Sequence, residues 1–392
     1  MRVPYDVLLA ILDIQSWRAD VQTISSMSQT CQVLRSAGVR HLLAHPIDLR
    51  DSRGVTSFNS FMHAERGRRF SLLRRRLAIT TGSLPPDAAE ALVELVCKIS
   101  HLERLVLLDA EHLLASDPRL PRAFAALTCL KHIEFSAAQE SDNSDCVYMF
   151  KRMRSQLASA TLHLPSSTRR WLNGRLNCEL ADPVGLLRNS ASTLTELRGT
   201  SFEARRHNVI YPHVKRLQVQ FGLLPDISPY IIAYPNITSL DVTSSSTFDV
   251  TTLPSFCWMN EDAQQRVGCW STLEELGGDL ADLYVISLRC RAESLRVSAR
   301  GRRGVLHYLT EVLSRAQPAR LRLEIDSSAL LASEDSSLAA VFQRTEASKC
   351  IRELDLRIVQ TQGDGRADVD VLFVRASSSC CLTRPLHANG VF

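Results

Sequence analysis

The sequence predicts an α/β protein in which a short helical segment, residues 1–45, precedes a curved solenoid of strand–helix units, residues 46–375. In the first segment, apolar residues recur at the three- and four-residue spacing of an amphipathic helix. After residue 45, a loose motif of the form apolar-x-x-apolar-x-apolar recurs about every 28 residues, a period typical of α/β solenoids. Residues 376–392 lack any periodicity and are expected to form a flexible tail.

Two helices are expected in the first segment. The first begins near Pro4, a residue suited to a helix start because it lacks an N–H group. Its apolar stripe consists of Pro4, Val7, Leu8, Ile11 and Leu12. The second follows Asp20, a good N-cap, and is expected to stop at Gly38. Its stripe consists of Val21, Ile24, Met27, Cys31 and Leu34.

Twelve copies of the repeated motif predict twelve strands. Six clear copies lie at 102–107, 130–135, 214–219, 237–242, 292–297 and 351–356. Six weaker copies lie at 47–49, 77–79, 162–164, 194–197, 273–276 and 321–325. Helical periodicity between them is found at 87–99, 306–313 and 336–342. A single strand–helix unit cannot bury its apolar face, so stacking is expected, although an irregular α/β domain would also produce this pattern.

The N-terminal segment resembles the F-box, a motif that opens with Leu-Pro and continues into an apolar helix. The motif closes with a helix that carries an aliphatic residue, a cysteine and a bulky residue a few positions apart. Val3 and Pro4 stand at the opening, with Val3 in place of the usual Leu. Met27, Cys31 and Leu34 stand at the close, with Leu34 where the family favours Trp.

This resemblance implies a non-enzymatic substrate receptor of an SCF-type (Skp–cullin–F-box) ubiquitin ligase. F-box motifs bind a Skp-type adaptor, which links them to a cullin scaffold. Many F-box proteins carry leucine-rich repeats behind the motif, and this layout is similar to that of the large F-box families of mushroom-forming fungi. The expected adaptor-binding residues are Pro4, Val7, Leu8, Ile11, Leu12, Ile24, Met27, Cys31 and Leu34.

The repeats are expected to bind an unknown target protein through their strands. Side chains alternate along a strand, so the residues between the apolar positions should point away from the core. The expected target-binding residues are Arg104, His132, Glu134, Arg216, Gln218, Asp241, Arg296, Arg322, Glu324, Asp355 and Arg357. Their mixed charges suit a polar protein surface better than a uniform polyanion. These residues could equally be no more than solvated strand positions.

Composition bears on the class of protein, its location and the state of its cysteines. The 392 residues carry a formal net charge of +4, which selects no class of partner, and 45% are hydrophobic, as in ordinary soluble proteins. No signal-peptide layout and no apolar run long enough to span a membrane is present, so we expect a soluble protein of the cytoplasm, the nucleus or both, with no membrane partner. Eleven cysteines without a C-x-x-C pair indicate buried free thiols rather than disulfides or zinc.

No catalytic motif, metal site or cofactor site is expected. His63 and Glu65 match half of a zinc-deaminase motif, but the second half is absent. Asp368 and Asp370 could face one side of a strand, and the neighbouring apolar residues favour a final strand there over a metal site. Six arginines between residues 66 and 76 are expected to form a solvated face, because apolar residues interleave with them.

Two other functions fit the same sequence. One is a non-ligase leucine-rich-repeat scaffold for protein–protein interaction, in which the first helices merely cap the solenoid. The other is a basic nuclear protein that uses the arginine run. Nucleic-acid binding is the less favoured of the two, because no further basic stripe follows the run and only 6% of residues are aromatic.

Overall fold

The structure, a computed structural model, describes residues 4–137, 144–164, 182–205, 207–221, 225–244, 249–299, 307–326, 338, 341–342 and 350–359. The chain divides into two compact units, Met1–Pro165 with Leu186–Leu194, and Ser166–Gly185 with Thr195–Phe392. This division falls within the repeats, and the boundary at residue 45 stays a prediction. The expected tail, the expected strand around Asp368 and most of the helix expected at 336–342 lie outside the described residues.

The first unit begins with three helices, α1 (Tyr5–Trp17), α2 (Val21–Ser28) and α3 (Gln32–Ala44). Pro4 precedes α1 in an extended conformation, and its carbonyl accepts hydrogen bonds from the N–H groups of Val7 and Leu8. Asp20 caps α2 as predicted, because its carboxylate accepts a hydrogen bond from the Thr23 N–H at 3.1 Å. Local sequence therefore determines where the first two helices begin.

The second predicted helix is in fact two helices, α2 and α3, and Gly38 does not stop it. Gly38 is buried inside α3, where a Cβ atom would lie 1.8 Å from Ser28 Oγ. Glycine is needed here because α2 and α3 approach each other closely, which no helix-stop rule reveals. The Ser28 hydroxyl in turn donates to the Ile24 carbonyl at 2.6 Å.

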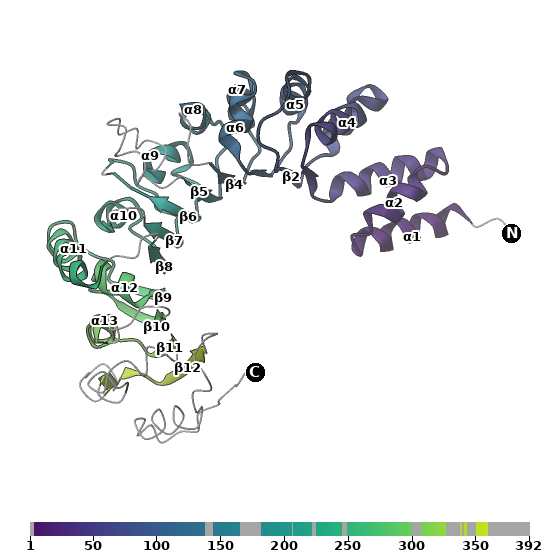
Figure 1. The fold of residues 1–392 in the computed structure, drawn as a ribbon. Helices are drawn as coiled ribbons and strands as arrows, with labels where there is room; N and C mark the ends of the chain where they lie inside the picture. The colour runs from purple at the N-terminus through teal and green to yellow at the C-terminus, as the bar shows by residue number, and fades with distance from the viewer. Residues whose placement is uncertain are drawn as a thin grey trace. The chain divides into compact units, whose positions relative to one another are not determined.

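Five parallel strands follow in the first unit, each paired with the next along the chain (Figure 1). These are β1 (Ile47–Leu49), β2 (Arg76–Ile79), β3 (Arg104–Leu107), β4 (His132–Ser136) and β5 (Ser159–His163). The intervening helices are α4 (Ser52–His63), η1 (Ala64–Leu72), α5 (Pro86–Lys98), α6 (Ala110–Ala115), α7 (Leu120–Ala125) and α8 (Ser144–Arg152). The helices from α4 to α8 cover one side of the sheet and leave its other side open.

The second unit holds seven parallel strands, again paired in sequence order. These are β6 (Glu196–Phe202), β7 (Arg216–Phe221), β8 (Ser239–Ser244), β9 (Thr272–Asp279), β10 (Arg291–Ala299), β11 (Arg320–Asp326) and β12 (Glu353–Val359). The helical segments are α10 (Ser228–Ala233), η4 (Val250–Thr252), α11 (Leu253–Val267), α12 (Leu280–Ile286) and α13 (Tyr308–Ala316). Before β6, α9 (Pro183–Leu186) lies at the division between the units and η3 (Arg188–Ser190) belongs to the first unit. All twelve predicted strands are confirmed, as are the helices predicted at 87–99 and 306–313.

The core of each unit is a set of apolar columns that run across the strands. In the first unit Leu77, Leu105 and Ile133 lie in register on β2, β3 and β4, and all three are buried. The column of the second unit is longer and consists of Leu197, Leu217, Leu240, Leu276, Leu295 and Leu321. The second apolar residue of the motif, at its fourth position, thus packs against its copies in the neighbouring repeats, which is why no repeat is stable alone.

Buried polar side chains also connect successive repeats. Ser155 Oγ accepts from the Leu130 N–H at 3.2 Å and donates to the Leu127 carbonyl at 2.5 Å. Asn260 makes a similar connection in the second unit, where its Oδ1 accepts from the Ile227 N–H at 3.1 Å. These bonds satisfy backbone groups that burial would otherwise leave unpaired.

We predict that Gly38→Ala destabilises the first unit by about 1–3 kcal/mol, because the added methyl group overpacks the contact with Ser28. Helix propensity alone would give the opposite sign, a gain of about 1 kcal/mol. Urea unfolding measures the difference. Ser28→Gly in the Gly38→Ala background should restore most of the loss, and a more stable Gly38→Ala protein would contradict the packing argument.

Candidate protein-docking surfaces

The three N-terminal helices have an apolar core of their own. Leu12, Ile24 and Leu34 are buried at its centre. They were predicted to contact an adaptor, but the structure places them inside, where they hold the helices together. The prediction assumed that two helices could not bury their stripes internally, and this premise is wrong because three helices do so. Adaptor binding itself stays a prediction.

The other predicted adaptor-binding residues remain accessible to different degrees. Pro4 and Val7 are exposed. Leu8, Ile11, Met27 and Cys31 are half-buried, and Leu8, Met27 and Cys31 pack against the rim of the buried core.

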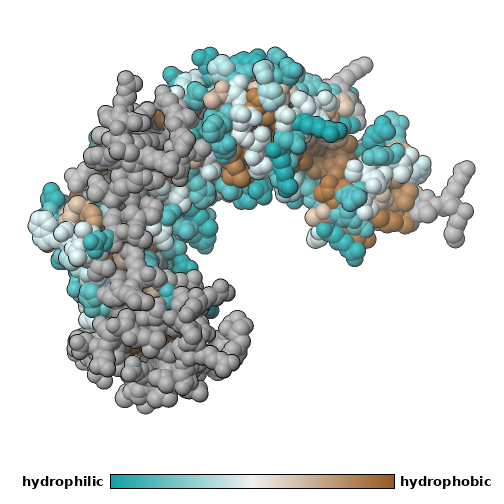
Figure 2. Space-filling model, viewed as in Figure 1, coloured by the Kyte–Doolittle hydropathy of each residue, from teal (hydrophilic) through white to brown (hydrophobic). Residues whose placement is uncertain are grey.

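Helix α1 is apolar on two sides. The side opposite Leu12 carries Val7, Ile11 and Ile14, which are spaced four and three residues apart and therefore lie on one face of the helix. Val7 is 47% exposed and Ile14 is 52% exposed, and Trp17 at the end of the helix is 92% exposed. We call Val7, Ile11, Ile14 and Trp17 the α1 stripe. Figure 2 shows hydrophobic residues gathered on these N-terminal helices.

Sequence reasoning missed Ile14 and Trp17. Ile14 could have been found from its position one heptad after Val7, which returns it to the same helix face. Trp17 could not have been assigned to this surface from the sequence, because a tryptophan near a helix end can be buried or exposed. Only the structure shows that it is exposed.

The predicted target-binding residues lie on strands of both units, and none of the eleven is buried. Their predicted orientation away from the core is confirmed. Their role in binding a target stays a prediction. The surroundings of these residues differ between the units. Several charges of the second unit form salt bridges with one another, whereas Arg104 of the first unit has no salt-bridge partner among the described residues.

Salt bridges cross the strand face of the second unit. Arg296 on β10 reaches Asp241 on β8 at 2.7 Å. It passes over Gly277 on β9, whose missing side chain leaves the path open. Asp355 lies 3.2 Å from Arg322 and 3.7 Å from Arg357. The mixed charges predicted for this face therefore largely neutralise each other.

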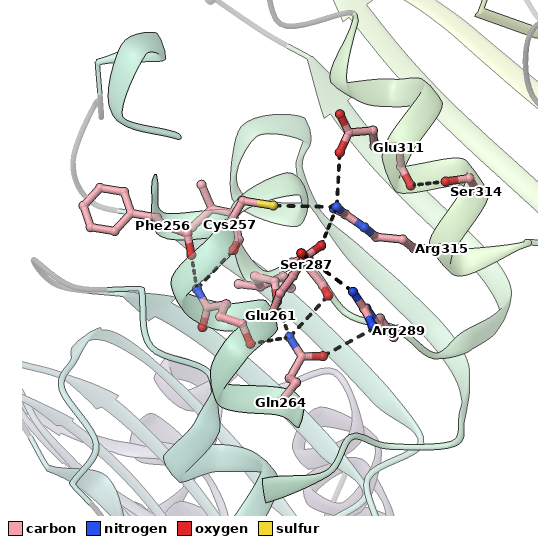
Figure 3. A network of polar contacts seen from close by, with 12 residues as sticks. Phe256, Cys257, Glu261, Gln264, Ser287, Arg289, Glu311, Ser314 and Arg315 are labelled. Carbon is pink, nitrogen blue, oxygen red and sulfur yellow. Dashed lines mark hydrogen bonds and ion pairs between the residues drawn. The ribbon is translucent and has the colours of Figure 1, made fainter. Parts of the chain in front are cut away.

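A polar network joins three helices of the second unit (Figure 3). Arg315 of α13 donates to Glu261 of α11 at 2.7 Å and to Glu311 at 3.1 Å. Ser287, which follows α12, donates to the same Glu261 at 2.9 Å. Gln264 of α11 donates to the carbonyls that end α12, among them that of Ile286 at 2.9 Å. Since Arg315, Ser287 and Gln264 each bind a group of another element of the same unit, the network stabilises the stacking of α11, α12 and α13.

We predict that Glu261→Ala lowers the free energy of unfolding by about 1–3 kcal/mol, because the poorly exposed Arg315 loses its interhelical partner. Asp262→Ala is the matched control. Asp262 pairs with Arg266 of its own helix at the surface, so its loss should cost less than about 1 kcal/mol. Thermal unfolding of both variants checks this, and equal losses would show that Glu261 has no special role.

The cysteines are only partly buried, which corrects the prediction. Cys146, Cys257 and Cys290 are buried, whereas Cys97, Cys129 and Cys350 are exposed. Cys178, Cys380 and Cys381 lie outside the described residues. A hydrogen bond from the Cys290 thiol lowers the pKa of the Cys269 thiol to about 7. Burial and this same interaction raise the pKa of Cys290.

We predict that Cys269 reacts with iodoacetamide at pH 7, because about half of its thiol is ionised and the thiolate is the nucleophile. Cys290→Ala removes the hydrogen-bond donor, so the pKa of Cys269 should rise and the reaction should slow by about fivefold. Mass spectrometry of the peptide that contains Cys269 measures the rate. An unchanged rate in the variant would contradict this account.

The motifs with a possible metal role do not gather ligands. His63 lies 3.3 Å from Glu94 of α5, within a surface cluster that also contains Lys98. Asp368 and Asp370 lie outside the described residues. In the described part of the chain, no group of three His, Cys, Asp or Glu residues could hold a metal ion. No helix in that part is long and apolar enough to cross a membrane.

The arginine run divides between the inside and the outside of the first unit. Arg69 is buried, and its guanidinium donates to the Phe61 carbonyl at 2.9 Å and lies 4.3 Å from the centre of the Phe61 ring. Arg74 and Arg75 are exposed before β2. Most of the run up to Leu72 lies in the 3-10 helix η1.

No protein-family model matches the chain, and no curated protein matches it.

Proposed function

We propose that this protein is the substrate receptor of an SCF-type ubiquitin ligase. In this proposal the three N-terminal helices bind a Skp-type adaptor, and a cullin scaffold joins through that adaptor. The leucine-rich-repeat-like units bind the target protein, while the ubiquitin chemistry belongs to partner subunits. The receptor itself needs no catalytic residue or cofactor.

The observation that carries the proposal is the α1 stripe. A helix whose inner side is already buried in a core has no structural need for Val7 and Ile14 on its outer side, and their exposure to water is unfavourable. An exposed apolar patch of this kind is typical of a protein-binding surface. Its place on a short helical segment before a repeat array agrees with the F-box resemblance of the same residues.

The resemblance and the geometry together reassign the proposed adaptor-binding residues. Leu12, Ile24 and Leu34 provide the internal core, whereas Pro4, Val7, Ile11, Ile14 and Trp17 provide the contact surface. This arrangement gives mutations of the two sets different consequences, which makes the proposal testable.

We predict that the double variant Val7→Asp, Ile14→Asp loses the Skp-type adaptor while its melting temperature stays close to that of the parent. Both positions are about half exposed, so charges there remain hydrated in the free protein but would be buried unpaired in the complex. The measurement is affinity purification from the native cell, followed by detection of the adaptor and the cullin.

Two controls make this result specific. Ile210→Asp changes an isoleucine of the second unit that is 55% exposed, and it should leave adaptor binding intact. Leu12→Asp should unfold the helices, because it places a carboxylate in their core. If neither adaptor nor cullin co-purifies with the parent protein, the ligase proposal is wrong and a scaffold role becomes the better account.

A further inference from the structure

The open side of the first unit concentrates positive charge on adjacent strands. Arg76 of β2 and Arg104 of β3 are register partners, and His132 of β4 is the next residue in the same row. Neighbouring strands lie about 4.8 Å apart, so the two arginines stand side by side. Like charges placed directly opposite each other are unfavourable unless something neutralises them.

The first unit does not supply that neutralisation. Among the described residues, Arg74, Arg75, Arg76, Arg104 and Arg154 have no salt-bridge partner within 4 Å. The Nε atom of Arg76 is buried and has no hydrogen-bond partner. The nearby carboxylate of Glu103 is engaged with Lys131 at 3.0 Å, and this interaction lowers the pKa of Glu103. The charge of Arg74 contributes to this lowered pKa as well. Among the described residues, Arg75, Arg76, Arg104 and Arg154 are therefore the arginines without a compensating carboxylate at this end of the sheet.

A cavity of about 550 Å³ opens beside these arginines. Its charged lining is Arg74, Glu103, Lys131 and Arg154, and His101 also lines it. Three of these residues adjoin the row in sequence, because Arg74 lies two residues before Arg76, Glu103 directly precedes Arg104, and Lys131 directly precedes His132. The row and the cavity lining therefore adjoin in sequence at the N-terminal ends of β2, β3 and β4. We call the two together the β2–β4 basic surface.

We propose that the β2–β4 basic surface binds a short peptide segment that carries closely spaced negative charges. This inference rests on the proposed function, since the segment would belong to the target protein. Arginine guanidinium groups bind carboxylates and phosphates through paired hydrogen bonds, and such an anion would offset the repulsion between Arg76 and Arg104. The second unit makes a poorer anion site, because its Arg296 and Arg322 already bind Asp241 and Asp355.

A peptide fits this surface better than a nucleic acid does. Three strands span about 10 Å, which accommodates only a few extended residues. The large hydrophobic side chains exposed in the described residues, Trp17 and Tyr148 among them, are all outside the row and the cavity lining, so bases would find no stacking partner there.

The test uses the full chain and fluorescein-labelled decapeptides in which glycine alternates with glutamate, phosphoserine or glutamine. Fluorescence anisotropy should show that the glutamate or the phosphoserine peptide binds at least tenfold more tightly than the glutamine peptide, with an affinity that falls as salt is added. The ratio between the two anionic peptides tells which anion the surface prefers. A single-stranded oligonucleotide of similar charge is the competing probe.

The decisive variants lose the same charge from different surfaces. Arg74→Gln with Arg104→Gln should weaken anionic peptide binding by about tenfold or more, because two charge-assisted contacts are lost. Arg266→Gln with Arg320→Gln removes two positive charges from the second unit, at positions outside the expected target-binding set. It should change binding by less than about twofold, because those arginines are already paired with Asp262 and Glu293. Arg154→Gln, at another residue of the cavity lining, should weaken binding independently of the first pair.

Several results would overturn the inference. These are no preference for anionic peptides over the glutamine peptide, equal losses in the two double variants, or tighter binding of the oligonucleotide than of either anionic peptide. Adaptor co-purification is measured on the same proteins. Lost peptide binding with intact adaptor binding defeats this inference alone, and intact peptide binding without adaptor defeats the ligase proposal alone.

Discussion

The in-register stacking of apolar side chains from one strand to the next is the constraint on which the rest of this protein depends. Leu105 is buried because Leu77 and Ile133 lie beside it, and Leu240 is buried because Leu217 and Leu276 do. Each repeat supplies one side chain to each column, so its stability depends on its neighbours. The same register brings Arg76 beside Arg104 on the open side, and the core and the proposed binding surface are thus two faces of one arrangement.

Polar groups that cross between repeats make this arrangement specific. Ser155 and Asn260 occupy different places in the sequence motif, yet each binds backbone groups of the preceding repeat. The Arg315 network connects helices of neighbouring repeats in the second unit, because Arg315 and Ser287 both donate to Glu261. Apolar columns alone would tolerate small slips between repeats, whereas a buried hydrogen bond is lost when its partner moves by about an ångström.

The N-terminal helices follow a different rule, because they build a core among themselves. Leu12, Ile24 and Leu34 satisfy the inner sides of the three helices, and the close contact between Gly38 and Ser28 brings α2 and α3 together. The outer side of α1 is also apolar, but its side chains do not pack into the core of the three helices. A helix that is apolar on both sides but buried on only one leaves an apolar surface that another protein can bind. The residues of the buried side are then structural, and those of the exposed side are the candidate contact residues.

The sequence by itself determined the strands, because a buried strand in a repeat leaves a local pattern of apolar residues that needs no knowledge of its neighbours. It also determined the start of α2, since the Asp20 cap acts over three residues. Only the tertiary structure decided that Gly38 lies within a helix, that Leu12 is buried while Ile14 is exposed, and that Arg322 is paired while Arg104 is not. These outcomes depend on contacts between residues far apart in the chain or on neighbouring elements, which a local pattern does not encode.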